Sequence, residues 1–319
     1  MVWRQMNWLL LGVGVASGAW AQEGVSQVVP TDNAAETTME PETPEPIAER
    51  ARKANGMVEQ RVQREERTAN DPFVLTPHRP NYFLPVYYAQ KSGNRDLYNS
   101  ANPNDTLQDT EFKFQVSMKF PVAKGVLGDD SKLWFAYTQE SYWQAYNSKI
   151  SAPFRDTSYE PEAFITKETD FTFLGTKLTH INFGVNHQSN GRGEPLSRSW
   201  NRVFADFVFE HDNTVVSFKP WYRIPESKAD DDNPDIEKYL GHGELTLVHV
   251  VNDVTYDLQL RNNLDFSTNR GAVRLGVSFP MWGKVRGYAQ YFEGYGQSLL
   301  DYDNYTRSFG IGFMLTNWL

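Results

Sequence analysis

The feature that most constrains this fold is a period-two alternation of apolar and polar residues, which returns in segment after segment. Such alternation is typical of β-strands that have one apolar and one polar face. One segment has apolar residues at Phe112, Phe114, Val116, Met118 and Phe120. About twelve segments show it, near residues 82–89, 111–122, 132–145, 160–173, 178–189, 201–210, 213–224, 238–250, 253–264, 270–280, 284–293 and 305–318.

An even number of antiparallel strands can close into a barrel that has no free edge. A sheet inside the hydrocarbon core of a membrane must close in this way, because no water is present there to form hydrogen bonds with unpaired backbone groups. We therefore predict an all-β fold, a transmembrane antiparallel β-barrel of about 12 strands within residues 76–319. Apolar side chains would face lipid, and charged side chains would pair inside. A soluble β-sandwich is the alternative, and the patterning alone does not separate the two.

The N-terminus favours export. Arg4 precedes an apolar run over residues 8–15, and Ala19-Trp20-Ala21 is typical of a cleavage site, so we predict a signal peptide over residues 1–21. The run is too short to span a membrane, and no later stretch approaches the ~20 apolar residues that a spanning helix needs. The absence of cysteine leaves no disulfides, and the net charge of −9 argues against nucleic acid as a partner.

A polar N-terminal extension is predicted over residues 22–75. Its first part is acidic and contains several prolines, a composition typical of disorder. Residues 47–68 are dense in Glu, Arg and Gln, which predicts a solvated helix.

Three polar side chains stand at the end of an apolar strand face. His187 and Ser189 are two residues apart, so they emerge on one face. Asn201 begins the next strand after a loop of about eleven residues, which allows it to lie beside His187 in an antiparallel pair. The imidazole can take the serine proton, and a third group must orient the imidazole. An amide suits this role near lipid, where an ionised carboxylate is costly.

This spacing predicts a hydrolase triad, although an isolated interfacial histidine and a rim hydroxyl would give the same pattern. The loop that follows is rich in oxygen donors. Ser197 and Glu194 lie near the flexible Gly191 and Gly193, whose turns free backbone carbonyls. Such oxygens suit calcium, which can polarise an ester carbonyl.

Specific sequence blocks carry a resemblance to a known family. The most specific is Asn186-His187-x-Ser189-Asn190-Gly191-Arg192 together with Ser197-Arg198-Ser199-Trp200-Asn201-Arg202. Supporting blocks are Tyr137-Thr138-Gln139, Ser151-x-Pro153-Phe154-Arg155, Tyr159-Glu160-Pro161, Lys219-Pro220-Trp221-Tyr222 and Asp231-Asp232-Asn233-Pro234-Asp235. With these blocks the chain resembles outer-membrane phospholipase A, from Asn70 to the C-terminus.

The resemblance implies a calcium-dependent outer-membrane enzyme that hydrolyses acyl esters of phospholipids, with A1, A2 and lysophospholipase activity. It implies a twelve-stranded barrel with its active site on the outer surface. The family's nucleophile falls on Ser189, its base on His187 and its orienting amide on Asn201.

The resemblance also implies calcium sites and a homodimer. One site falls on Arg192 and Ser197 and is completed by Ser151 of a second copy of the chain. A further calcium position falls on Asp232, and calcium-dependent dimerisation activates the family. Gln139 agrees with a dimer, because it shares the lipid-side face of its strand and an unpaired amide is costly there. Solvation of Gln139 among the lipid headgroups is the alternative.

Two other functions remain open at this point. One is a non-enzymatic barrel, a pore or an adhesin, which would have no use for a Ser–His–Asn cluster that faces lipid. The other is an outer-membrane deacylase that acts on lipopolysaccharide. That enzyme would share the serine chemistry, and the sequence blocks argue against it.

Overall fold

The structure, a computed structural model, describes residues 56–69, 75–90, 94–104 and 106–319. These residues belong to one compact unit, Pro46–Leu319, and a second unit comprises Met1–Glu45. The predicted signal peptide, residues 1–21, and most of the predicted extension lie outside the described residues. No helix in the described ranges is long and apolar enough to cross a membrane.

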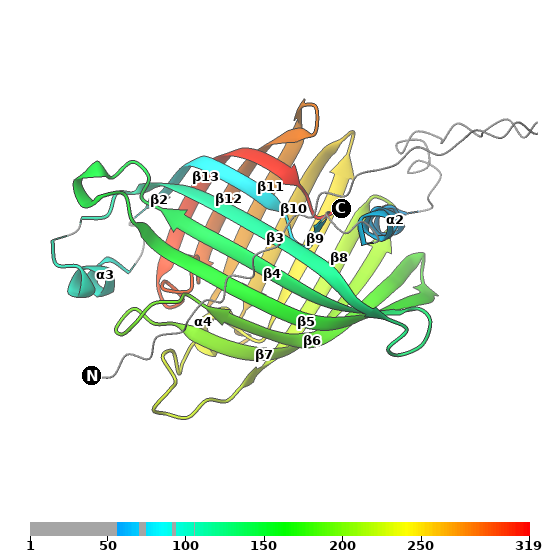
Figure 1. Cartoon of the computed structure of the whole chain (residues 1–319), viewed down its shortest axis with the longest axis horizontal. Helices are drawn as coiled ribbons and strands as arrows, with labels where there is room; N and C mark the ends of the chain where they lie inside the picture. The colour runs from blue at the N-terminus through cyan, green and yellow to red at the C-terminus, as the bar shows by residue number, and fades with distance from the viewer. Residues whose placement is uncertain (1–55, 70–74, 91–93, 105) are drawn as a thin grey trace, which may run out of the picture. The chain divides into compact units, whose positions relative to one another are not determined.

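The described chain forms one antiparallel sheet that closes on itself (Figure 1). The ring closes because the last strand pairs with the first long one and β3 pairs with β4. Its strands are β2 (Asn81–Gln90), β3 (Thr110–Lys124), β4 (Ser131–Trp143), β5 (Phe154–Phe173), β6 (Thr176–Ser189), β7 (Ser199–His211), β8 (Thr214–Ile224), β9 (Gly243–Val251), β10 (Val254–Asn262), β11 (Gly271–Trp282), β12 (Val285–Tyr295) and β13 (Tyr305–Thr316). A short strand, β1 (Thr76–Pro77), adds to β3 and brings the sheet to 13 strands. The predicted all-β barrel is confirmed.

The apolar face of the strands points outward. On β6, Phe183 is 60% exposed and Val185 is 50% exposed, while Asn186 between them and the loop is buried. Ile311 on β13 is likewise exposed. This arrangement inverts that of a soluble sandwich and matches a barrel surrounded by hydrocarbon.

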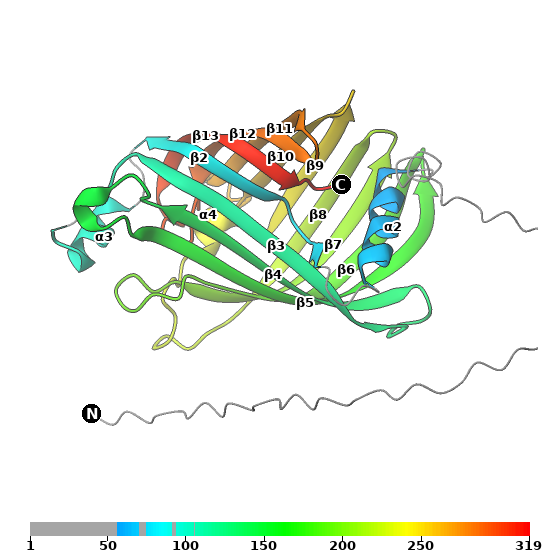
Figure 2. The same cartoon turned by 45° about the horizontal axis from the view of Figure 1, so that its top comes forward.

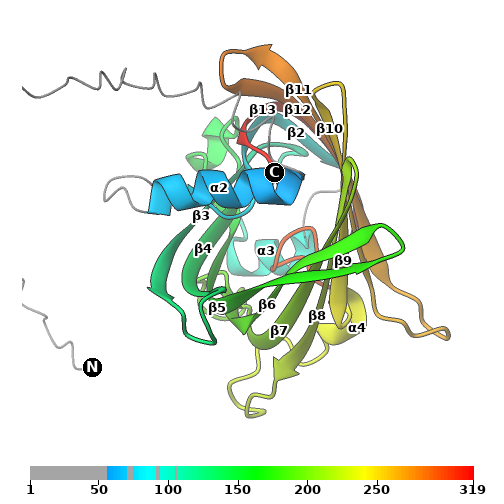
Figure 3. The same ribbon diagram turned by 90° about the vertical axis from the view of Figure 1, so that its right-hand side faces the viewer.

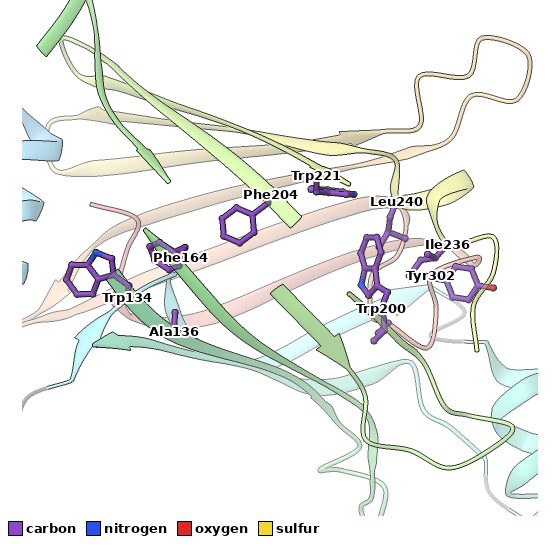
Figure 4. Packing of buried hydrophobic residues seen from close by; sticks show 10 residues of the cluster. Trp134, Ala136, Phe164, Trp200, Phe204, Trp221, Ile236, Leu240 and Tyr302 are labelled. Atoms are coloured by element: carbon purple, nitrogen blue, oxygen red, sulfur yellow. The ribbon is translucent and has the colours of Figure 1, made fainter. Parts of the chain in front are cut away.

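The inside of the barrel is polar, and many of its charges are paired. Arg202 contacts Glu160 at 3.0 Å, Arg79 contacts Glu160 at 2.7 Å, and Arg155 contacts Glu111 at 2.8 Å. Arg79, Glu160 and Arg202 line an interior cavity of about 910 Å³. Aromatic and aliphatic side chains also meet inside, as Figure 4 shows: Trp200, Ile236, Leu240 and Tyr302 gather at one end of this cluster, and Trp134 and Phe164 lie at the other.

The two ends of the barrel differ. At one end the strands are joined by tight turns, such as those at Leu174–Gly175 and Asp212–Asn213, and the chain ends there. At the other end the connections are long, and they include residues 190–198 and 225–242. Membrane barrels have short periplasmic turns and longer external loops. The end of β6 and the start of β7 therefore lie on the external side.

Of the helix predicted over residues 47–68, the described part is helical, and it is packed on one side rather than solvated all round. Helix α2 (Met57–Ala69) packs against the short-turn end of the barrel (Figures 2 and 3). Glu65 contacts Lys119 of β3 at 2.9 Å, and Arg61 donates to the backbone carbonyls of His78 and Trp318. Polar helix residues find buried partners because the lumen they face is itself charged.

The external loops hold two short helices, α3 (Arg95–Ala101) and α4 (Glu237–Leu240), and a single 3₁₀ turn, η1 (Ser148–Ile150). The start of the strand predicted over residues 238–250 was wrong. Its first residues lie in α4, and β9 begins only at Gly243. The chain reverses at Gly241, whose φ of 72° is open mainly to glycine. The Gly241 carbonyl then accepts a hydrogen bond from the Trp221 indole at 3.0 Å.

Candidate active site

Strands β6 and β7 bring the predicted histidine and asparagine together. In their antiparallel register His187 stands directly opposite Asn201, and Ser189 stands opposite Ser199. His187 Nδ1 and Asn201 Oδ1 are 2.8 Å apart, a hydrogen-bond distance. The predicted proximity of His187 and Asn201 required that β6 and β7 pair in this register, and they do.

Ser189 lies two residues beyond His187 on the same face of β6, and both side chains are half-buried. Among the described residues no hydrogen bond joins the Ser189 hydroxyl to the imidazole. Such contacts are commonly loose without substrate and tighten in the complex. With Nδ1 engaged by Asn201, Nε2 is the ring nitrogen left for Ser189.

Ser189, His187 and Asn201 form a line of polar groups, and Glu226 extends it beyond Asn201. The sequence did not predict this role for Glu226. It lies just beyond the end of β8, and its Oε1 accepts a hydrogen bond from Asn201 Nδ2 at 2.7 Å. A carboxylate only accepts, so the NH₂ of the amide must face Glu226 and the amide oxygen must face His187. His187 must then donate through Nδ1.

The inner face of the same two strands is tightly bonded. Arg202 donates to Asn186 Oδ1 at 2.6 Å and to Glu160 at 3.0 Å. The Trp200 indole donates to Gln188 Oε1 at 2.8 Å, and Trp200 is fully buried. These contacts alternate with the outward site residues, so they hold the backbone that positions His187 and Asn201.

The loop between β6 and β7 is organised by Asn190. Its side-chain amide donates to the Leu196 carbonyl at 2.8 Å. Its Oδ1 accepts from the backbone N–H of Arg192 at 3.2 Å and of Arg198 at 3.0 Å. Gly191 has a φ of 64°, which the tight turn after Asn190 requires. The loop is therefore a folded element that holds its oxygen atoms in fixed places.

Of the four predicted calcium residues, two are in direct contact. Ser197 donates to Asp232 Oδ2 at 2.5 Å, so these two lie together. The Arg192 guanidinium donates to the Arg155 carbonyl at 3.2 Å, which leaves its own backbone carbonyl as the atom that could bind a cation. Ser151 is exposed in the loop between β4 and β5, in a left-handed conformation with φ 61°, and among the described residues no hydrogen bond joins it to the other three.

Glu194, which the sequence suggested only as one of the oxygen donors of this loop, joins the Ser197–Asp232 group. The hydrogen bond and the negative charge of Asp232 raise the pKa of the Glu194 carboxyl. Two carboxyl groups and a hydroxyl that meet in this way form a donor set of hard oxygens, which fits calcium. In the part of the chain that the structure describes, no three His, Cys, Asp or Glu residues cluster as a metal site. Any calcium here would therefore also use hydroxyl and backbone oxygens.

Gln139 of β4 is half-buried and finds partners within its own chain. Its amide donates to Ser141 Oγ at 3.1 Å, and the Tyr137 hydroxyl donates to its Oε1 at 3.3 Å. An intrachain network thus meets part of the hydrogen-bonding need that the sequence argument assigned to a second copy.

The fold and the site define a class: membrane β-barrels that carry a serine, a histidine and an oriented amide on their outer wall. Comparison with known proteins identifies the family. The phospholipase A1 family model matches residues 58–315. The chain belongs to the phospholipase A1 family, and its predicted location in the outer membrane is confirmed with it.

Known relatives agree with this assignment. Phospholipase A1 of Klebsiella pneumoniae is 42% identical over 248 residues, which cover 78% of this chain and 84% of the relative. The structure of outer membrane phospholipase A from Escherichia coli matches with a TM-score of 0.74 and 38% identity, covering 78% of this chain and 95% of that one.

Two further structures are informative. The Salmonella typhi outer membrane phospholipase, a dimer with bound calcium, matches with the same TM-score of 0.74, 38% identity and the same coverage of 78% and 95%. An E. coli structure with these same values is described as an active-site mutant in which an asparagine is replaced by alanine.

Proposed function

We propose that this protein is a calcium-dependent phospholipase that hydrolyses acyl esters through Ser189, His187 and Asn201. The observation that carries the proposal is the hydrogen bond between His187 and Asn201, on the outer wall of a barrel and beside a serine. Membership of the phospholipase A1 family supports the substrate class. The E. coli active-site mutant supports a role for an asparagine.

The chemistry follows from the order of the groups. Ser189 Oγ attacks the ester carbonyl carbon while His187 Nε2 takes its proton. His187 then gives that proton to the departing alcohol, which leaves as lysophospholipid, and the acyl group stays on Ser189. Water then attacks the acyl carbon while His187 Nε2 takes a proton from it, and the fatty acid leaves as His187 returns that proton to Ser189 Oγ. Asn201 Oδ1 accepts from Nδ1–H throughout and so holds the ring in the useful tautomer.

Substrate would approach sideways from the outer leaflet. The site stands above exposed apolar residues of its own strand, Phe183 and Val185, on which acyl chains can lie. Because it opens onto the barrel wall, the ester at either glycerol position can reach Ser189. We therefore propose A1, A2 and lysophospholipase activity together, to be tested with lipids labelled at a single acyl position.

Calcium and dimerisation form the second part of the proposal. The Arg192 carbonyl and Ser197 would hold calcium, completed by Ser151 of a second copy, and Asp232 with Glu194 would hold another. Bound calcium would supply positive charge to the ester oxygen as it becomes negative. Ser151 supports this model because it is exposed and so accessible to a second copy of the chain. The calcium-bound dimer from Salmonella typhi supports it independently.

Release of fatty acid from a diacyl phosphatidylcholine in detergent micelles, with and without calcium, tests the activity. Ser189→Ala should abolish calcium-dependent release. Ser199→Ala is the matched control, because it removes a hydroxyl directly across the strand pair and should leave the rate within about threefold. Heat-modifiable gel mobility verifies that each barrel is folded. Activity retained by Ser189→Ala would remove Ser189 as the nucleophile.

Chemical crosslinking and activity, titrated with calcium in one detergent, test the bridged site. Both should rise over the same calcium range, and Ser197→Ala should shift both to about tenfold higher calcium, as loss of one ligand predicts. Full activity in a preparation that stays monomeric would contradict the bridged site while leaving the triad assignment intact.

A further inference from the structure

Glu226 lies at the far end of the line of polar groups that begins at Ser189. It accepts from Asn201 Nδ2 at 2.7 Å, and Asn201 in turn contacts His187 at 2.8 Å. The contact joins residues 25 positions apart, from the loop after β8 to the start of β7. It therefore results from the fold of the external loops and not from a local turn.

The carboxylate is held in a costly environment. Its second oxygen, Oε2, is buried, and no hydrogen-bond partner for it exists in the part of the chain that the structure describes. Carboxylates near the membrane boundary normally point to water, and a buried unpaired oxygen calls for a reason. The contact with Asn201 is the one hydrogen bond that the structure gives to Glu226.

The loop that carries Glu226 is anchored on both sides. Arg223 of β8 donates to Asp231 at 2.6 Å, and Asn233 accepts from the backbone N–H of Ser199 at 2.9 Å. Ser227 donates to Asp230 at 2.6 Å directly after Glu226. The position of Glu226 is thus fixed against the start of β7.

An amide can present either its oxygen or its NH₂ group to the imidazole, whereas a carboxylate presents an acceptor oxygen in both orientations. If the Asn201 side chain turned over, its NH₂ would face His187 Nδ1, and the imidazole proton would have to sit on Nε2. That tautomer cannot take the proton of Ser189. A group that only accepts, placed behind the amide, excludes this orientation because it must receive the NH₂.

We propose that Glu226 is a positioning residue that locks Asn201 in the orientation productive for catalysis, an inference that rests on the proposed function. Glu226 makes the neutral amide behave like the carboxylate of a Ser–His–Asp triad. The formal charge stays one residue farther from the reacting ester and from lipid. Glu226 itself touches neither Ser189 nor substrate.

Replacement of Glu226 tests the direct effect in the full-length protein. Glu226→Ala should lower kcat by about tenfold and leave KM within about twofold, because the triad remains but its amide is free to turn. Glu226→Gln should recover most of the rate, since its carbonyl oxygen can still accept from Asn201. Glu237→Ala, which removes a carboxylate from the same external loop, is the matched control and should behave as the unmodified protein.

A second pair of variants makes the prediction sharper. In an Asn201→Asp background the orienting group can no longer be misplaced, and Glu226 becomes an adjacent like charge. Glu226→Gln should therefore raise the rate of Asn201→Asp by about tenfold, although the same change slightly lowers the rate of the unmodified protein. A role in loop stability alone would give the same sign in both backgrounds.

The outcomes separate the two proposals. If Ser189→Ala is inactive and Glu226→Ala is as active as the unmodified protein, Glu226 has no positioning role and the triad stands. If Glu226→Ala loses activity and Glu226→Gln does not restore it, or if the double variant shows no reversal of sign, the positioning role is also overturned. If Ser189→Ala stays active, the proposed function fails first. Heat-modifiable mobility and calcium-dependent crosslinking verify fold and assembly for each variant.

Discussion

The two faces of the β6–β7 strand pair solve the burial of polar groups in opposite ways. The inner face neutralises full charges by mutual contact: Glu160 is shared between Arg79 and Arg202 at 2.7 and 3.0 Å. The outer face, among apolar side chains, carries one line of polar groups whose links to each other run through the neutral Asn201. Charged side chains are tolerated inside the barrel because oppositely charged partners surround them. On the outer wall the charge is carried by Glu226, behind Asn201 and away from Ser189.

The difference separates stability from reactivity. The polar groups of the inner face each make several hydrogen bonds. They therefore hold the backbone in place and have no donor or acceptor left for a reaction. On the outer face Asn201 contacts both His187 and Glu226, and His187 keeps a ring nitrogen for Ser189. Substitutions on the outer face should therefore lower kcat with little change in stability, whereas substitutions on the inner face should lower stability with little change in kcat.

The largest effect should come from the outer face. His187→Ala should lower kcat by about 10³- to 10⁴-fold, because it removes the base that takes the serine proton. His180→Ala is the control, since His180 lies on the same strand but lines the interior cavity. The rate of fatty acid release and heat-modifiable mobility are measured for both. Equal losses of rate would show that the comparison of faces is wrong.

The inner face should respond in stability. Glu160→Gln leaves Arg79 and Arg202 without their shared carboxylate, and breaking such a buried arrangement costs about 3 kcal/mol. The temperature of the mobility shift should fall clearly while kcat of the folded enzyme changes less than about threefold. Glu168→Gln on the same strand removes an exposed contact with Lys132 at 3.4 Å and should change little.

A smaller loss of rate is expected from the orienting amide. Asn201→Ala should lower kcat by about 10- to 100-fold, less than His187→Ala, because the amide orients the ring and does not react. Parallel measurement of kcat and KM distinguishes this from weaker lipid binding. A loss as large as that of His187→Ala would give Asn201 a direct chemical role.

The smallest effect concerns helix α2. Burial would raise the pKa of the Glu65 carboxyl, but the charges of Lys119 and Arg61 outweigh it and lower the pKa from 4.5 to about 2. The stabilisation by Glu65 is then complete above its unfolded value, and it is lost as pH falls from about 4.5 through about 2. Docking of α2 should weaken over this range.

The cysteine-free chain makes this measurable, because Glu59→Cys on the exposed side of α2 can carry a spin label. The label should gain mobility as the pH falls. Glu65→Gln should be mobile already at neutral pH and should not change further. Glu66→Gln, at an exposed contact with Lys132, serves as the control. Titration identical in all three proteins would rule out Glu65 as the group responsible.

The sequence predicted those features that repeat locally. Alternation located all twelve barrel strands, and the loop length placed Asn201 within reach of His187, as the register confirms. The start of β9 was misplaced because Tyr239 and Leu240 continue an apolar pattern although they lie in α4. Contacts made by irregular loops carry no period, so the contact of Glu226 with Asn201 and that of Glu194 with Asp232 could not be predicted from the sequence.

Helix α2 was predicted as a helix but not as a packed one, for a related reason. Its residues are polar, and only the charged lumen makes a polar surface suitable for burial. Residues such as Lys119 belong to a strand about fifty positions away, so the complementarity of Glu65 and Lys119 becomes visible only after closure of the barrel.

The contacts of α2 also predict an order of events during assembly. Near the start of the described chain, Arg61 donates to the carbonyl of Trp318, one residue before the end of the sequence, and Arg64 donates to Leu319 at 3.2 Å. These carbonyls reach their places only when β13 has paired with β2. We therefore expect α2 to dock only after the barrel has closed. A label on α2 would report, in real time, the moment at which the first and last strands of a newly inserted barrel meet.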